Sequence, residues 1–157
     1  MVELNYCKIK INVQEKEFDV NKENDELIIN NAGAMVNFVG TVRGELLSSE
    51  KILSLSIEHY SGMTENEILK IAEKAKKKWK LEAITIIHRV GILLPTDKIV
   101  YVGVSSKHRQ DSFNACNFII DWLKTSAPFW KSEEFESGKK WVNERKEDHV
   151  ALKKWKG

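Results

Sequence analysis

A strand followed by a buried helix is encoded in residues 98–124, KIVYVGVSSKHRQDSFNACNFIIDWLK. Its first part, Lys98 to Ser106, is rich in β-branched residues and predicts a strand. From Asp111 to Lys124, apolar residues cover nearly the whole circumference of a helix, so this helix is expected to be buried on most sides. Pro128 marks its end, because proline cannot continue a helix. The core is therefore expected to combine strands and helices.

More strands are predicted on the N-terminal side of this unit. Ala83 to Arg89 is a run of β-formers, and the turn Pro95-Thr96-Asp97 joins it to the strand described above, which predicts a hairpin. Ala34 to Arg43 and Ile52 to Tyr60 flank a polar stretch and are expected to form an antiparallel pair. Residues 6–13 alternate apolar and polar side chains and predict the first strand.

Two further helices complete the pattern. Asn21 to Asn31 predicts a short helix, and Thr64 with Glu67 three residues later is a capping-box signature that starts a longer one. The tail, residues 129–157, follows without a Gly/Ser/Pro-rich linker and is expected to fold back onto the rest of the chain. Hairpins mixed with helices predict the α+β class.

The composition excludes several classes of protein. The chain has 157 residues, a length that favours one core, so residues 1–157 are expected to form a single domain. It lacks an apolar run of about 18–20 residues, so no membrane span is expected. The N-terminus has no signal-peptide pattern, which favours a cytoplasmic setting. The net charge is only +2, and no motif that recognises nucleic acid is evident. These features argue against a nucleic-acid partner and favour a small anionic ligand.

Cationic side chains stand where the predicted strands and helices end. They are Arg43, His108, Arg109, Lys124 and Lys131. Arginine and lysine suit phosphate and carboxylate groups, and functional residues concentrate on loops held by rigid elements. The simpler interpretation of each is a solvated charge at an element end.

Lys124 and His108 each have two interpretations. Lys124 follows Trp122-Leu123 and precedes an aromatic segment, residues 128–130, so partial desolvation would lower its pKa, whereas the helix dipole would favour the charged amine. His108 could transfer a proton, bind an anion or bond a nearby carbonyl. The lysine run between residues 74 and 80 is interpreted as the solvated face of its helix, with an anion-binding or partner-binding patch as the alternative.

The sequence offers no metal or nucleotide motif. There is no HExxH, GxGxxG, Walker loop or GxSxG elbow. Cys7 and Cys116 have no CxxC spacing, and the apolar neighbours of Cys116 predict a raised thiol pKa and a packing role. The alternative is a sulfur-carrying nucleophile. The other histidines also lack metal-ligand spacing: His59, His88 and His149.

Five ordered blocks resemble one known family along nearly the whole chain. They are FVGTVR (38–43), IEHYSGMTE (57–65), IIHRVGILLPTD (86–97), VGVSSKHR (102–109) and DWLKTSAPFWKSE (121–133). On these blocks the chain resembles the large, catalytic subunit of molybdopterin synthase.

The resemblance implies a fold, an activity and partners. The implied fold is an α/β hammerhead with an additional antiparallel α+β subdomain. Two such subunits are expected to form a central homodimer, with a small ubiquitin-like sulfur carrier at each far end of a heterotetramer. The implied reaction transfers two sulfurs from carrier thiocarboxylates onto cyclic pyranopterin monophosphate, which opens the cyclic phosphate and forms the dithiolene of molybdopterin. No cofactor is implied for this subunit, which supplies no sulfur of its own.

The resemblance also assigns site residues. Lys124 and Lys131 are implied as catalytic, with a role for Lys124 toward the carrier's acyl end or in acid–base chemistry. The implied substrate-binding residues are Thr41, Val42, Arg43, His108, Arg109, Lys124, Lys131, Ser132, Glu133 and Arg145. Ser132 departs from the basic residue that many relatives have, so only its backbone position is carried over. Some of these residues are expected from the neighbouring protomer, and the region of Trp155 is expected to help receive the carrier.

Two other functions remain open on the residues alone. One is a noncatalytic module that binds an anion or nucleotide with the same basic cluster. The other is thiol-based sulfur transfer through Cys116.

Overall fold

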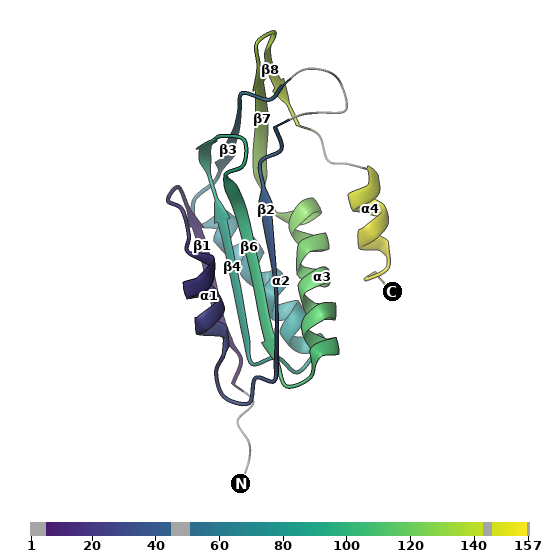
Figure 1. The fold of residues 1–157 in the computed structure, drawn as a ribbon. Coiled ribbons are helices and arrows are strands. Elements are labelled where there is room, and N and C mark those ends of the chain that lie inside the picture. Colours follow the sequence, from purple (N-terminus) through teal and green to yellow (C-terminus); the bar gives the residue numbers. More distant parts are fainter. Residues whose placement is uncertain (1–5, 45–50, 143–145, 157) are drawn as a thin grey trace.

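The computed structural model describes residues 6–44, 51–142 and 146–156 (Figure 1). Within these residues, eight strands form two four-stranded sheets, and four helices accompany them. The elements are, in chain order, β1 (Lys8–Gln14), α1 (Val20–Leu27), β2 (Ala34–Thr41), β3 (Ser54–His59), α2 (Met63–Lys78), β4 (Ala83–Arg89), β5 (Gly91–Leu93), β6 (Lys98–Ser106), α3 (Arg109–Ser126), β7 (Phe129–Phe135), β8 (Gly138–Trp141) and α4 (Lys146–Lys153). This arrangement confirms the α+β class.

The larger sheet has the strand order β1-β4-β6-β2. β4 and β6 pair antiparallel, from Ala83 opposite Ser105 to His88 opposite Val100, which confirms the predicted hairpin. β2 pairs antiparallel with the other edge of β6, and β1 runs parallel to β4. β6 is therefore a central strand, as its apolar sequence requires.

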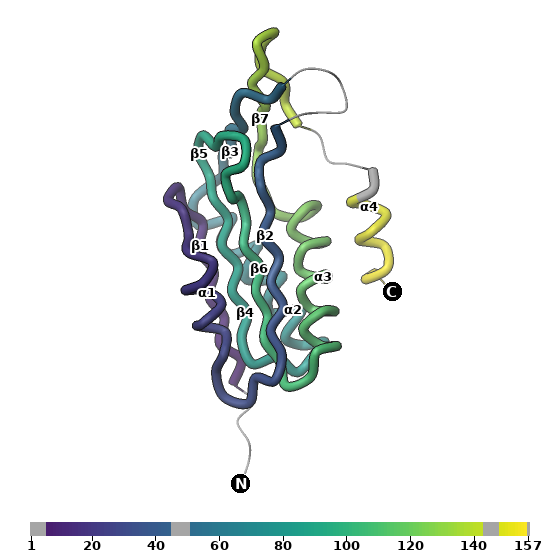
Figure 2. Tube along the Cα trace, in the orientation of Figure 1, coloured from purple at the N-terminus to yellow at the C-terminus, as the bar shows by residue number. Residues whose placement is uncertain are grey.

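The smaller sheet has the order β5-β3-β7-β8 and lies beyond one end of the larger sheet (Figure 1). The predicted antiparallel pair of residues 34–43 with 52–60 is wrong, because β2 and β3 belong to different sheets. β3 pairs instead with β5 and β7, so that Ile57 lies opposite both Gly91 and Lys131. Figure 2 shows how β3 and β7, far apart in sequence, run alongside each other at this end.

The larger sheet is covered on both faces. Ile84 and Ile86 point to one face and pack in the cluster formed with α2 and α3, while Ala83 and Ile87 point to the other and pack with Leu27 of α1. This division follows from the alternation of side chains along a strand. The two faces explain why all seven residues of β4 are buried.

Both long helices differ in detail from their predicted forms. The N-cap of α2 is Gly62, whose backbone N–H donates to the Glu65 carboxylate at 2.7 Å, and the predicted capping box starting at Thr64 is wrong. Thr64 instead donates its hydroxyl to the carbonyl of Tyr60 at 3.0 Å. Seven of the 18 residues of α3 are buried and Phe113 is 58% exposed, so the helix is less buried than its apolar circumference predicts. Within the described residues, no helix is both long and apolar enough to cross a bilayer.

The tail folds back as predicted. β7 and β8 extend the smaller sheet, and α4 lies beside α3 (Figure 1). Trp155, just after α4, packs edge-on against Trp79 and Phe118 at ring-centre distances of 5.8 and 5.4 Å. Its indole N–H donates to a carboxylate oxygen of Asp121 at 2.6 Å. Aromatic packing and this hydrogen bond together fasten α4 to α3.

Candidate functional site

A pocket of about 570 Å³ opens where the larger sheet, the last turn of α3 and β7 meet. Lys124 from α3 and Lys131 from β7 both line it. The ends of β2 and β6 supply part of the wall, and Phe129 and His88 supply aromatic surface. The volume lies within the range of about 300–1,000 Å³ that is usual for small-molecule sites.

Lys131 is the desolvated cation of this pocket. Its pKa is lowered, first by burial and then by the positive charge of Lys124, whereas Asp148 acts in the opposite direction. The side chain of Lys124 is 52% exposed and its ammonium lies 3.8 Å from the Asp148 carboxylate. Desolvation was predicted for Lys124, but it is found at Lys131, because β7 turns this side chain inward whereas Lys124 leaves the last turn of α3 toward solvent.

Glu133 faces the pocket from the same side of β7 as Lys131. The two residues are separated by one position, so their side chains share a face. Burial raises the pKa of the Glu133 carboxyl, and its buried Oε2 has no hydrogen-bond partner among the described residues. Ser132, between them, is 4% exposed and is not among the residues that line the pocket. The structure therefore does not bring Ser132 to the pocket, although its two neighbours on β7 line it.

The loop after β2 forms the rim. Thr41, Val42 and Arg43 all line the pocket, with Val42 buried and the other two exposed. The backbone N–H of Val42 donates to the carbonyl of Asp97, and that of Thr96 donates to the carbonyl of Val42, both at 2.9 Å. These bonds fix the backbone from which Arg43 extends.

His108 and Arg109 are not brought to this pocket within one chain. Both are exposed at the opposite end of α3 from Lys124. Fifteen residues of helix separate Arg109 from Lys124, which corresponds to about 22 Å along the axis. Arg145 lies outside the described residues. A single chain therefore supplies only part of the predicted cationic cluster.

His88 is a pocket residue that the sequence analysis did not predict, because its spacing to the other histidines indicates only the lack of a metal site. It lines the pocket and its ring stacks on Phe129, with centres 3.9 Å apart and planes inclined by 20°. Its Nδ1 lies 2.8 Å from the carbonyl oxygen of Arg89. Burial, aided by the charge of Lys131, lowers the pKa of His88 to about 3. The available signal was its spacing, since residues 84, 86 and 88 share one face of the strand and the first two are core isoleucines.

The two thiols are buried away from the pocket. Burial raises the pKa of Cys116 to about 12, and its Sγ lies 3.8 Å from the carbonyl oxygen of Val102. Burial also raises the pKa of Cys7 to about 11. Neither side chain lines the pocket. These observations support the packing role predicted for Cys116.

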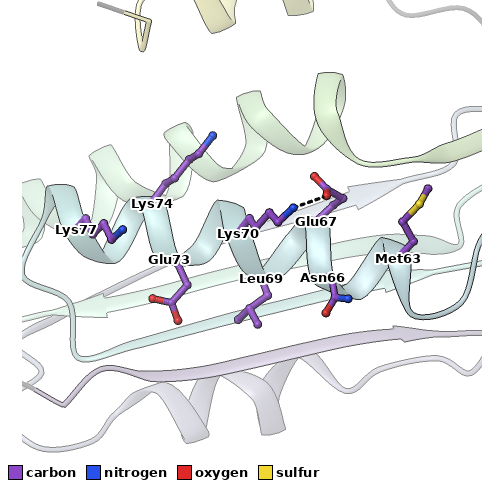
Figure 3. Close-up of a pocket in the computed structure, with 8 residues that line it drawn as sticks. All are labelled: Met63, Asn66, Glu67, Leu69, Lys70, Glu73, Lys74 and Lys77. Carbon is purple, nitrogen blue, oxygen red and sulfur yellow. Dashed lines mark hydrogen bonds and ion pairs between the residues drawn. The ribbon is translucent and has the colours of Figure 1, made fainter.

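A second hollow lies on the outer surface of α2 (Figure 3). Its lining residues, from Met63 to Lys77, all come from that one helix, and Lys70 pairs with Glu67 at 2.9 Å. Part of the lysine run is used in packing, since the Lys74 ammonium lies 4.1 Å from the ring centre of Trp122 on α3. The hollow is therefore a groove in a solvated helix surface.

The fold and the pocket define a class: an α+β protein with a lysine-rich, partly aromatic pocket suited to a phosphate-bearing ligand. The family pattern described as MoaE protein matches residues 13–126. The chain belongs to this family.

Relatives and solved structures agree. The chain is 44% identical to the molybdopterin synthase catalytic subunit of Vibrio cholerae over 147 residues, which cover 93% of this chain and 97% of that one. It is 47% identical to the protein of the same name from Escherichia coli K12, over 78% of this chain and 81% of that one. The structure of the molybdopterin biosynthesis MoaE protein from Burkholderia ambifaria matches with a TM-score of 0.79 at 43% identity, covering 94% and 97% of the two chains. That of molybdopterin synthase from Staphylococcus aureus gives 0.79 at 32% identity, covering 84% and 96%.

Proposed function

We propose that this chain is the catalytic subunit of a molybdopterin synthase. It acts as a sulfurtransferase that moves sulfur from the thiocarboxylate of a small ubiquitin-like carrier onto cyclic pyranopterin monophosphate, forming the molybdopterin dithiolene. The observation that carries the proposal is the convergence of Lys124 and Lys131 in one pocket that no thiol lines, in a chain of this family. Sulfur must then arrive on another protein.

The two lysines have different roles in this proposal. Lys124 lies at the exposed mouth and engages the acyl end of the incoming carrier. Lys131, desolvated inside, stabilises the negative charge that develops on the substrate as the cyclic phosphate opens. Arg43 at the rim supplies a planar fork for phosphate oxygens. Ser132 contributes through its backbone, and Thr41, Val42 and Glu133 complete the substrate-binding wall.

The remaining site residues come from a second protomer in this proposal. His108 and Arg109 lie too far from Lys124 in their own chain, so a homodimer brings them to the partner's pocket. Arg145 is assigned to the substrate site by the family resemblance alone. Two carriers bound to this dimer give the heterotetramer. We further propose a single domain with the α/β hammerhead fold, an additional antiparallel subdomain and a cytoplasmic location. The chain's own residues account for the proposed steps, so no cofactor is assigned.

A single-turnover assay with cyclic pyranopterin monophosphate and thiocarboxylated carrier tests this function. Wild type and Cys116→Ala should both form the dithiolene product, whereas Lys124→Ala should form little while remaining folded by circular dichroism. A noncatalytic binding module would hold the pterin and form no product with any of the three proteins. Loss of product in Cys116→Ala, with folding retained, would instead support thiol-based transfer.

A further inference from the structure

His88 is the pocket-lining residue to which the proposed function gives no role. It lies near the end of β4, between Val13 of β1 and Val100 of β6, where the larger sheet meets the smaller one. Only 5% of its surface is exposed, and its ring is stacked on Phe129 of β7. Phe129, Lys131 and Glu133 share one face of β7, so the imidazole stands at one end of this row.

The hydrogen bonds around His88 determine its tautomer. A carbonyl oxygen only accepts, so the Nδ1 that lies 2.8 Å from the Arg89 carbonyl oxygen carries the proton. The backbone at Arg89 is itself held, because the Arg89 guanidinium donates to the carbonyl of Glu15 at 2.9 and 3.1 Å and to that of Lys98 at 3.3 Å. The imidazole is therefore fixed in one orientation, and its Nε2 bears a lone pair.

That lone pair has no donor within the described part of the chain. Because burial lowers the pKa of His88 to about 3, the ring is neutral at physiological pH and Nε2 can only accept. The same pocket contains a second acceptor without a partner among the described residues, the buried Oε2 of Glu133. Buried acceptors are normally satisfied, so the Glu133 oxygen calls for a donor, and His88, which lines the same pocket, can accept from the same ligand.

We propose that His88 binds the substrate directly, with Nε2 accepting a hydrogen bond from a ring N–H of the reduced pterin. This assignment rests on the proposed function and divides the pocket by chemistry. Arg43 and the two lysines receive the phosphate, whereas His88 and Glu133 receive the donor edge of the ring system. The cyclic phosphodiester carries no proton at neutral pH, so an acceptor cannot bind its oxygens, and His88 selects for the pterin part of the ligand.

Two conservative variants separate the proposed hydrogen bond of Nε2 to the substrate from the structural hydrogen bond of Nδ1 to Arg89. His88→Asn keeps a donor at the position of Nδ1 for the Arg89 carbonyl but has no atom at Nε2. His88→Gln places an amide oxygen near Nε2 and loses the Nδ1 position. Calorimetric titration with cyclic pyranopterin monophosphate should show an affinity about three- to tenfold weaker for His88→Asn, as expected for one lost hydrogen bond. His88→Gln should stay within about twofold of wild type, as expected where the acceptor is restored.

Inorganic phosphate is the control ligand, and it should bind wild type and both variants equally. Equal pterin affinity in wild type and His88→Asn would overturn the assignment, as would an equal loss in both variants. Product formation by wild type in the single-turnover assay is recorded in parallel, so failure of this inference is distinguishable from failure of the proposed function.

A wild-type measurement covers the case in which a variant does not fold. The isotope-labelled imidazole nitrogens are observed by NMR, and the His88 signal is identified as the buried neutral ring that keeps its shift in mild acid. Addition of the pterin substrate should move the Nε2 resonance in the direction expected for an accepted hydrogen bond, whereas inorganic phosphate should leave it in place. An unmoved Nε2 resonance at saturating pterin would overturn the proposal.

Discussion

Replacing His88 should remove a large part of the protein's sensitivity to mild acid. In the unfolded chain, its imidazole takes up a proton near the ordinary histidine pKa of 6.5, whereas in the folded chain burial lowers this pKa to about 3. Between these values the unfolded state binds more protons, so the free energy of unfolding falls as the pH falls. The full difference corresponds to about 5 kcal/mol, and roughly half of it is lost between about pH 7 and about pH 4.5.

Urea unfolding at these two pH values measures the effect directly. The acid-induced loss of unfolding free energy is measured in wild type and in His88→Gln, and the two losses are subtracted. The other titrating groups remain in the variant, so the remainder is due to the buried imidazole. The acid-induced loss of unfolding free energy should be smaller by about 2–3 kcal/mol in His88→Gln, and similarly in His88→Asn. The same loss in wild type and both variants would refute the interpretation that His88 is buried and neutral.

Three other substitutions have defined outcomes. Lys131→Met should raise the free energy of unfolding at neutral pH, and its advantage over wild type should shrink as the pH rises toward 10.5, because the folded-state pKa of Lys131 is lowered; chemical unfolding of both proteins across alkaline pH measures this difference. Cys116→Ala should cost about 1–2 kcal/mol in a urea melt while product yield in single turnover is unchanged. Gly103→Ala should cost about 1–3 kcal/mol in the same melt, since its Cβ would lie 2.5 Å from Leu27 and 2.6 Å from Tyr101; wild-type stability would contradict this packing.

Individual helices and strands were predictable where the pattern within their own segment determines them. The strand at 98–106 and the helix after it follow from β-propensity and from apolar residues around the helix, and both are present as β6 and α3. The pairing of β3 was not predictable in this way, because alternation shows that a strand has two faces without showing which strand lies beside it. Its partner β7 starts 70 positions after β3 ends.

The sequence predicted which residue types form the site better than it predicted where their side chains lie. The sequence indicated Lys124 and Lys131, but only the inward face of β7 decides that Lys131 is the desolvated one. His108 and Arg109 are adjacent to the strand–helix junction in sequence, yet α3 carries them away from Lys124. His88 became recognisable only when Phe129, from another sheet, was placed against its ring.

The central claim is that the pocket around Lys131 is where sulfur reaches the pterin. Its most direct test is single-turnover sulfur transfer with labelled thiocarboxylated carrier in excess over cyclic pyranopterin monophosphate, since each dithiolene takes sulfur from two carriers. The assay compares wild type, Lys131→Met and Lys77→Met, the last being the same exchange in the groove on α2. We predict labelled dithiolene from wild type and Lys77→Met, and a rate lower by about a hundredfold or more for Lys131→Met, as for loss of a group that stabilises developing charge. Equal rates for the two lysine variants, with the fold intact, would contradict the account.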